Sequence, residues 1–118
     1  NDQTVIDYLA HYDRGNITMQ VRSKIIEQLP DGRPSQGDIA GRLNTSQRSL
    51  QRKLRDEDTS FKELLGETQR ELALYYIRDS NRSIGEITYL LGFSEPSNFT
   101  RAFKRWTGIT PGEYLENH

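Results

Sequence analysis

Two stretches of this sequence, SQGDIAGRLNTSQRSLQRKL at residues 35–54 and SIGEITYLLGFSEPSNFTRAF at residues 83–103, resemble each other and decide the fold. The matching positions lie 48 residues apart and are serines that can cap a helix, an acid three residues after the first serine, and apolar residues. They pair Ser35, Asp38, Ile39, Leu43 and Ser46 with, in the same order, Ser83, Glu86, Ile87, Leu91 and Ser94. Past the second cap the offset becomes 49, pairing Leu50, Arg52 and Leu54 with Phe99, Arg101 and Phe103. Each stretch predicts a short capped helix, a turn and a second capped helix, the layout of a helix-turn-helix unit. A single copy would fit an ordinary corner between two helices equally well, but two copies joined by a long helix favour helix-turn-helix.

Helical periodicity extends over the rest of the chain and predicts an all-α fold of about seven helices, with no convincing strand. A weak pattern covers residues 1–15, which are either a linker from an absent upstream domain or a packed first helix. We expect a first helix-turn-helix subdomain at 16–59, a linker helix at 60–80 that Ser60 and Glu63 begin as a capping box, and a second subdomain at 81–118. Ser94 is expected to cap the helix that ends near Gly108, and Thr110-Pro111 to restart a last helical turn.

The second helix of each unit presents a basic face opposite its apolar face. On a helical wheel, inward-pointing Leu50 and Leu54 place these polar residues outside: Arg48, Ser49, Gln51, Arg52 and Arg55. In the second unit, inward-pointing Phe99, Phe103 and Trp106 leave these outside or beside the outer face: Ser97, Asn98, Thr100, Arg101, Lys104 and Arg105. Guanidinium, amide and hydroxyl groups bind base edges and phosphate oxygens, so DNA binding is a better interpretation than a merely solvated face.

The overall charge gives the opposite indication. The 118 residues include 16 Lys and Arg against 17 Asp and Glu, for a net charge of -1, whereas a phosphate-binding domain is usually basic. The acids fall elsewhere, in Asp56–Asp58, expected to help end a helix, and in an exposed strip of Glu63, Glu67 and Glu71. Glu95 is open to two interpretations, as a bond to cytosine N4 or as a favourable acid in the first helical turn. We therefore expect weak non-specific binding and reliance on both basic faces together.

Composition excludes several classes of function. There is no cysteine, and the histidines are His11 and His118, so we expect no enzyme activity, no catalytic or metal-binding residues and no cofactor. The longest apolar run, residues 72–77, is far shorter than the roughly 20 residues of a membrane span. Because the chain opens at Asn1, we expect a piece of a longer protein. The serious rival to DNA binding is a helical protein-interaction module, which would carry apolar residues on both outward faces.

Four motifs in the second half together resemble a known signature: Ile84-x-x-Ile87, Gly92-Phe93-Ser94, Phe99-Thr100-Arg101-x-Phe103-Lys104 and Gly108-x-Thr110-Pro111-x-x-Tyr114. They are similar to the AraC/XylS family of bacterial transcription regulators, and the resemblance covers residues 17–116, with upstream matches at Ile39-Ala40, Ser46, Leu50-Gln51-Arg52, Arg70 and Ala73. The resemblance implies two helix-turn-helix units bridged by a long helix that bind double-stranded promoter DNA. It also implies a cytoplasmic, nucleoid-associated protein, RNA polymerase as a partner, and a sensing or dimerisation domain upstream of Asn1.

The resemblance also implies roles for individual side chains. The base-reading positions that it implies are Arg48, Gln51, Arg52, Ser97, Thr100 and Arg101. From their own chemistry and position, we expect Ser46, Arg55, Ser94, Lys104 and Arg105 to bind phosphates. The two recognition helices would enter successive major-groove segments about 34 Å apart, a spacing that the linker helix would fix. Three departures from the family pattern are Thr88 in place of a small alanine, Asp58-Thr59 in place of a glycine, and Pro96 at the start of the second recognition helix. Because Pro96 removes a side chain that could read a base, we expect the second unit to contribute more phosphate contact than discrimination.

Overall fold

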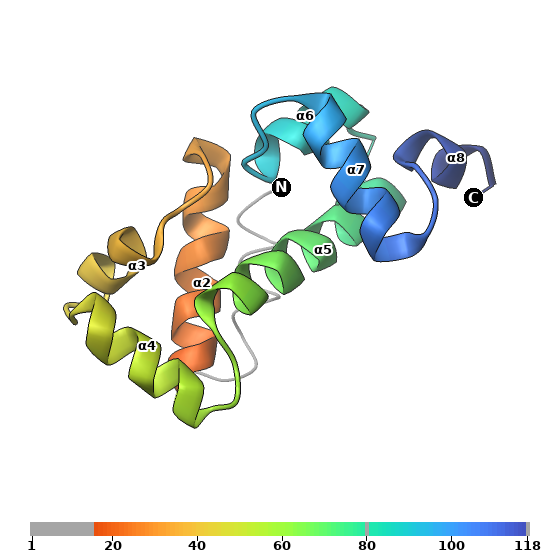
Figure 1. The fold of residues 1–118 in the computed structure, drawn as a ribbon. Helices are drawn as coiled ribbons and strands as arrows, with labels where there is room; N and C mark the ends of the chain where they lie inside the picture. Colours follow the sequence, from red (N-terminus) through yellow and green to blue (C-terminus); the bar gives the residue numbers. More distant parts are fainter. Residues whose placement is uncertain (1–15, 80, 118) are drawn as a thin grey trace. The chain divides into compact units, whose positions relative to one another are not determined.

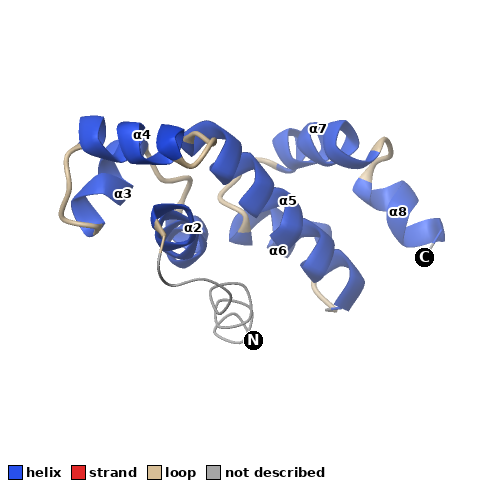
Figure 2. Cartoon of the chain, turned by 90° about the horizontal axis from the view of Figure 1, so that it is seen from below, coloured by secondary structure: helices blue, strands red, loops and turns tan. Residues whose placement is uncertain are grey.

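The computed structural model describes residues 16–79 and 81–117, so the helical pattern expected at 1–15 lies outside the described residues. The described residues form α-helices joined by turns and contain no strand (Figure 1, Figure 2), which confirms the all-α fold. The elements are α2 (Ile17–Gln28), η1 (Leu29–Asp31, a 3₁₀ turn), α3 (Gln36–Arg42), α4 (Gln47–Asp56), α5 (Phe61–Asp79), α6 (Ile84–Leu90), α7 (Pro96–Thr107) and α8 (Pro111–Asn117). They divide into two compact units, each described here by itself.

Unit 1 combines the described residues up to Gln28 with Pro34–Thr68, and so holds α2, α3, α4 and the start of α5 (Figure 1). Its core consists of aliphatic side chains that the helical pattern placed on one face of each helix. The side chains without any exposed surface in this core are Val21, Ile25, Ile39, Leu50 and Leu54. Because Leu50 and Leu54 are one turn apart, α4 packs inward along a single stripe and leaves its opposite face to solvent.

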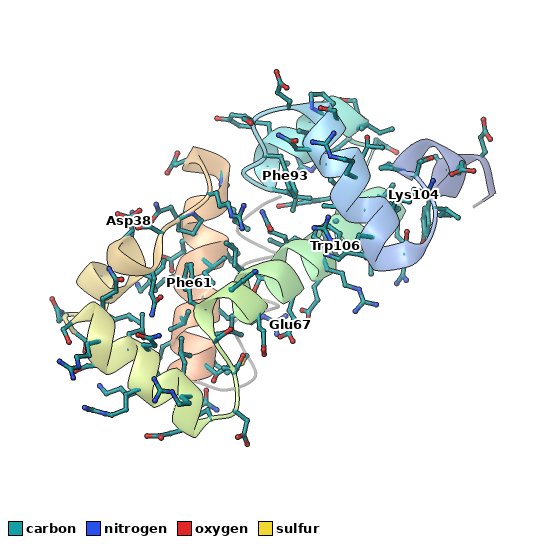
Figure 3. The ribbon with its side chains drawn as sticks, viewed as in Figure 1. Asp38, Phe61, Glu67, Phe93, Lys104 and Trp106 are labelled. Atoms are coloured by element: carbon teal, nitrogen blue, oxygen red, sulfur yellow. The ribbon has the colours of Figure 1, made fainter. Side chains whose placement is uncertain are left out.

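Unit 2 combines Leu29–Arg33 with Gln69–His118, and so holds η1, most of α5, and α6, α7 and α8. Its core combines buried aliphatic side chains with a cluster of aromatic rings: the ring centroids of Phe93 and Trp106, labelled in Figure 3, lie 6.4 Å apart, and those of Phe93 and Phe99 lie 5.8 Å apart. Phe103 contacts both Phe99 and Tyr114 edge-on, at 5.8 Å in each case. The rings of α7 therefore point into the unit, and its polar face points outward.

Local hydrogen bonds begin most helices where the sequence predicted. Ser35 with Asp38 and Ser83 with Glu86 form reciprocal capping boxes, and the Ser46 hydroxyl accepts a 3.0 Å bond from the Ser49 amide. At the start of α5, the Ser60 hydroxyl accepts a 3.2 Å bond from the Glu63 amide. A further box joins Thr110 and Glu113 at α8, with bonds of 3.0 and 3.1 Å. That last box was not predicted, although its spacing is the same.

The prediction that Ser94 caps the second recognition helix is wrong. The N-cap of α7 is Glu95, whose side chain makes no capping bond, and Pro96 is the first helical residue. Proline favours the first helical position and forces an extended backbone on the residue before it, which agrees with φ -146° and ψ 147° at Glu95. The change of offset therefore lies inside the turn, which holds Gly92, Phe93 and Ser94 in unit 2 but only Asn44 and Thr45 in unit 1.

Left-handed backbone occurs at corresponding places in the two units. Asn44 at φ 55° and Gly92 at φ 81° follow the first helix, while Asp58 at φ 62° and Gly108 at φ 89° follow the recognition helix. Asp58 thus adopts the conformation that a glycine would favour, because Asn and Asp tolerate this region better than most residues. Thr88 is also accommodated, since its buried hydroxyl donates a 2.7 Å bond to the Ile84 carbonyl.

Candidate nucleic-acid interface

The outward face of α4 is basic and accessible. Arg48, Gln51, Arg52 and Arg55 are all exposed, as the wheel predicted. Lys53 is exposed as well, so this ten-residue helix carries four cations. The one acidic residue of α4 is Asp56, at its last position. The side chains of this face can therefore meet a polyanion without a carboxylate among them.

An unpredicted contact holds the neighbouring Glu57 carboxylate against α2. It accepts bonds from the Ile17 and Thr18 amides at 3.2 and 2.9 Å and from the Thr18 hydroxyl. Partial burial acts to raise the pKa of Glu57, but these hydrogen bonds outweigh it and leave that pKa below its ordinary value. The sequence predicted only that this acid helps end α4, whereas the structure places it at the positive end of another helix.

The outward face of α7 is basic and partly preorganised. Ser97, Arg101, Lys104 and Arg105 are exposed, and Thr100 is half-buried. Arg101 donates a hydrogen bond through Nη2 to Asn98 Oδ1, and Asn98 Nδ2 lies 3.5 Å from Ser94 Oγ. No residue of α7 is acidic. Arg101 is thus held by a neutral amide, which leaves its positive charge available to a ligand.

The two remaining sequence-predicted residues are the serines. Ser46 is exposed at the N-cap of α4, where its hydroxyl oxygen accepts a bond from Ser49 and its proton stays available to donate. Ser94 is exposed in the turn before α7 rather than at its cap. Glu95 is the exposed N-cap residue of α7 and makes no capping bond with its side chain, so both interpretations of its role stay open.

Two hollows border the recognition helices and contain cations that the sequence did not single out. In unit 1, a hollow of about 310 Å³ is lined by Gln51 and Arg55 of α4 and by Lys62 of α5. In unit 2, a hollow of about 550 Å³ is lined by Arg101 and Arg105 of α7 and by Arg33, which follows η1. Arg33 and Lys62 lie outside both recognition helices, so a helical wheel of either helix could not find them.

Other kinds of site find no support in the described part of the chain. Residues 16–79 and 81–117 contain no group of three His, Cys, Asp or Glu side chains placed to hold a metal ion. None of the described helices is both long enough and apolar enough to cross a membrane. The large apolar side chains that are exposed among the described residues are Tyr89 and Leu115, and neither lies on α4 or α7. The basic faces are therefore the strongest candidate for a binding surface.

Comparison with known proteins gives the family. A protein-family model described as a helix-turn-helix domain matches residues 39–117, which include both recognition helices. The chain belongs to the AraC-type family of helix-turn-helix transcriptional regulators. Among solved structures, this AraC-type chain is similar to a DNA-binding transcriptional dual regulator from Escherichia coli K-12. The TM-score is 0.79 and the identity 31%, over 88% of this chain and 93% of that one.

Curated relatives of this AraC-type chain are longer. It is 40% identical over 101 residues to an uncharacterised HTH-type transcriptional regulator from Mycobacterium tuberculosis, a match that covers 86% of this chain and 29% of the relative. It is also 40% identical over 93 residues to the ornithine utilization regulator of Pseudomonas aeruginosa, covering 79% of this chain and 27% of that protein. The AraC-type chain thus spans less than a third of the length of these relatives. The family is one of DNA-binding transcriptional regulators and not a class of enzymes.

Proposed function

We propose that this AraC-type chain binds specific sequences in double-stranded DNA through α4 and α7, each in a major groove, and thereby regulates transcription at promoters. The observation that carries the proposal is the distribution of charge on the two helices. Their outward faces expose arginine and lysine among serine, threonine and glutamine, while the one acid on either helix is the terminal Asp56. Such faces provide both the cations that attract phosphates and the forked donors that read guanine.

We propose that the predicted roles of the side chains apply to this surface. Arg48, Gln51, Arg52, Ser97, Thr100 and Arg101 read base edges, and Ser46, Arg55, Ser94, Lys104 and Arg105 bind phosphates. The exposure of all but the half-buried Thr100 supports this assignment. We further propose that the protein acts with RNA polymerase and with an upstream effector or dimerisation domain. Its proposed location is the cytoplasm, at the nucleoid, where regulators of this family act.

A comparison of Arg52→Ala with Lys104→Ala tests the two kinds of contact. On the best duplex, selected from random sequences at stated salt, Arg52→Ala should cost about 1–3 kcal/mol and relax one base position. Lys104→Ala should weaken all duplexes to a similar degree and lower the slope of log K against log salt by about one unit. Fluorescence anisotropy with matched and scrambled duplexes measures both effects.

Lys24→Ala is a suitable control, because Lys24 lies on α2 and pairs with Glu27 at 3.7 Å. It removes one positive charge far from either recognition helix in the sequence and should leave both the base preference and the salt slope unchanged. Equal losses for Arg52→Ala on matched and scrambled duplexes would contradict the base-reading role. The absence of any enriched duplex at low salt would favour the protein-interaction module instead.

A further inference from the structure

We propose that Arg33, which lies outside both helix-turn-helix motifs, is a DNA-backbone ligand and that it completes, with Arg105 of α7, a phosphate-binding hollow bordered by the base-reading Arg101. This inference rests on the proposed function. It adds a site, here called the arginine hollow, which is lined by Arg33, Ser94, Asn98, Arg101 and Arg105, with the turn residues before α7.

The backbone at Arg33 is held in place by the turn of the second helix-turn-helix. A Cβ atom at Gly92 would lie only 3.1 Å from the Arg33 nitrogen and 3.1 Å from both the carbonyl oxygen and a methyl group of Leu29. Leu29 is fully buried, and the Gly32 amide donates a 2.9 Å bond to the Leu29 carbonyl. The segment therefore packs tightly on the glycine, and Arg33 emerges beside α7 from a defined position.

The chemistry of the arginine hollow suits a phosphate. Three guanidinium groups line it, and no carboxylate is among its lining residues. Within the described residues, none of these three arginines forms an ion pair with a carboxylate. The Ser94 hydroxyl and the Asn98 amide add neutral donors at the same place. Phosphate oxygens accept bonds from all these groups, and arginine forks match them in pairs.

The hollow lies on the flank of α7 rather than at the centre of its outward face. Asn98 and Arg105 are two helical turns apart and share one side of the helix, next to the face formed by Ser97, Arg101 and Lys104. When that face meets base edges in the major groove, the flank faces the backbone at the groove's edge. A backbone phosphate is therefore the occupant that both the charge and the position of the hollow favour.

The test compares wild type, Arg33→Ala and Arg33→Lys on the selected duplex over a range of salt. Removing one phosphate contact lowers the salt slope by about 0.9, so the affinity deficit of Arg33→Ala should shrink about 3.5-fold between 50 and 200 mM salt. Arg33→Lys keeps the charge and should restore most of the slope. The matched control is Lys24→Ala, and thermal unfolding of each variant checks the fold, which an exposed side chain at position 33 should not alter.

A second measurement locates the phosphate. Single neutral methylphosphonate groups are placed along each strand of the duplex. At one position the substitution should weaken DNA binding by the wild type and leave DNA binding by Arg33→Ala unchanged. An unchanged salt slope together with the lack of such a position would overturn the site while leaving the proposed function intact. A saturable response to inorganic phosphate alone, without a change of slope, would assign the hollow to a free anion and also overturn it. Failure of wild type to bind any duplex would overturn both proposals.

Discussion

Among single residues, Glu57 shows how one carboxylate can stabilise a helix 39 positions away. It accepts bonds from the first amides of α2, where backbone donors lack partners within the helix and the helix dipole favours a negative charge. Asn16 contributes a second cap, because its Oδ1 accepts a 2.9 Å bond from the Met19 amide. Two side chains thus cap the start of α2, Asn16 from the position just before the helix and Glu57 from the end of α4.

We expect Glu57→Gln to lower the free energy of unfolding by about 1 kcal/mol at neutral pH, as loss of a cap typically does. Because the pKa of Glu57 is lowered in the folded state, its ionisation contributes stability that is fully present above the ordinary glutamate pKa of about 4.5. That contribution is lost as the pH falls through the lower folded pKa. The difference between wild type and Glu57→Gln should therefore be constant near neutrality and shrink below about pH 4.

Urea unfolding at several pH values measures this difference. Asp56→Asn is the matched control, since Asp56 is exposed one residue earlier on α4. It should leave both the stability and its pH dependence close to those of wild type. An Asp56→Asn variant as unstable as Glu57→Gln would show that overall charge, and not the contact with α2, is responsible.

Among elements, the two helix-turn-helix turns differ in their need for glycine. Gly92 combines φ 81° with a close approach of Leu29 and Arg33, whereas Asn44 at φ 55° holds the equivalent place in unit 1. A side chain at position 92 would thus be disfavoured twice, by its backbone conformation and by contact with η1. The second turn is specialised for receiving the segment that carries Arg33.

We expect Gly92→Ala to destabilise the protein by at least about 1–2 kcal/mol, the cost of left-handed backbone for a residue with a Cβ atom. Gly41→Ala is the matched control, because Gly41 lies within α3 with nothing within 4 Å of an added Cβ. That change should stabilise the helix by about 0.5–1 kcal/mol. Thermal or urea unfolding measures the stability of both variants. A Gly92→Ala variant as stable as Gly41→Ala would contradict the packing argument.

Helix positions were predictable because the caps act over three residues. Ser35, Ser46 and Ser83 each bond an amide in the next turn, so the sequence alone locates those starts. The start of α7 was misplaced by one residue because the repeat favoured Ser94, while Pro96 controls the boundary. Thr110 and Glu113 have the same three-residue spacing and form the box at the start of α8.

The binding surface was predictable only in part. A helical wheel identifies exposed side chains on α4 and α7, since burial follows the period of the helix. It gives no information about Arg33 and Lys62, which reach the hollows from other elements. Such contacts depend on which distant segments pack together, and neither periodicity nor composition specifies that.

For the whole molecule, the net charge of -1 is a sum in which acidic residues elsewhere in the chain offset the basic outward faces of α4 and α7. Each face alone offers few phosphate contacts, so we expect tight binding to require both units on the same duplex. Inserting half a helical turn, about 5 base pairs, between the two selected half-sites should reduce the affinity toward that of the better half-site alone. Anisotropy with the two duplexes measures the change, and an unchanged affinity would show that the units do not act together.

Unit 2 is built from two separate segments of the chain, and this affects the order in which the two units fold during synthesis. Leu29–Arg33 leaves the ribosome before α3 and α4, yet its partner Gly92 follows about sixty residues later. At the rates of bacterial synthesis, about 5–20 residues per second, this segment waits several seconds with Leu29 unburied. Unit 1 can complete its core during that interval. We therefore expect the nascent chain to hold one folded helix-turn-helix while Leu29–Arg33, which belongs to the other unit, is still exposed.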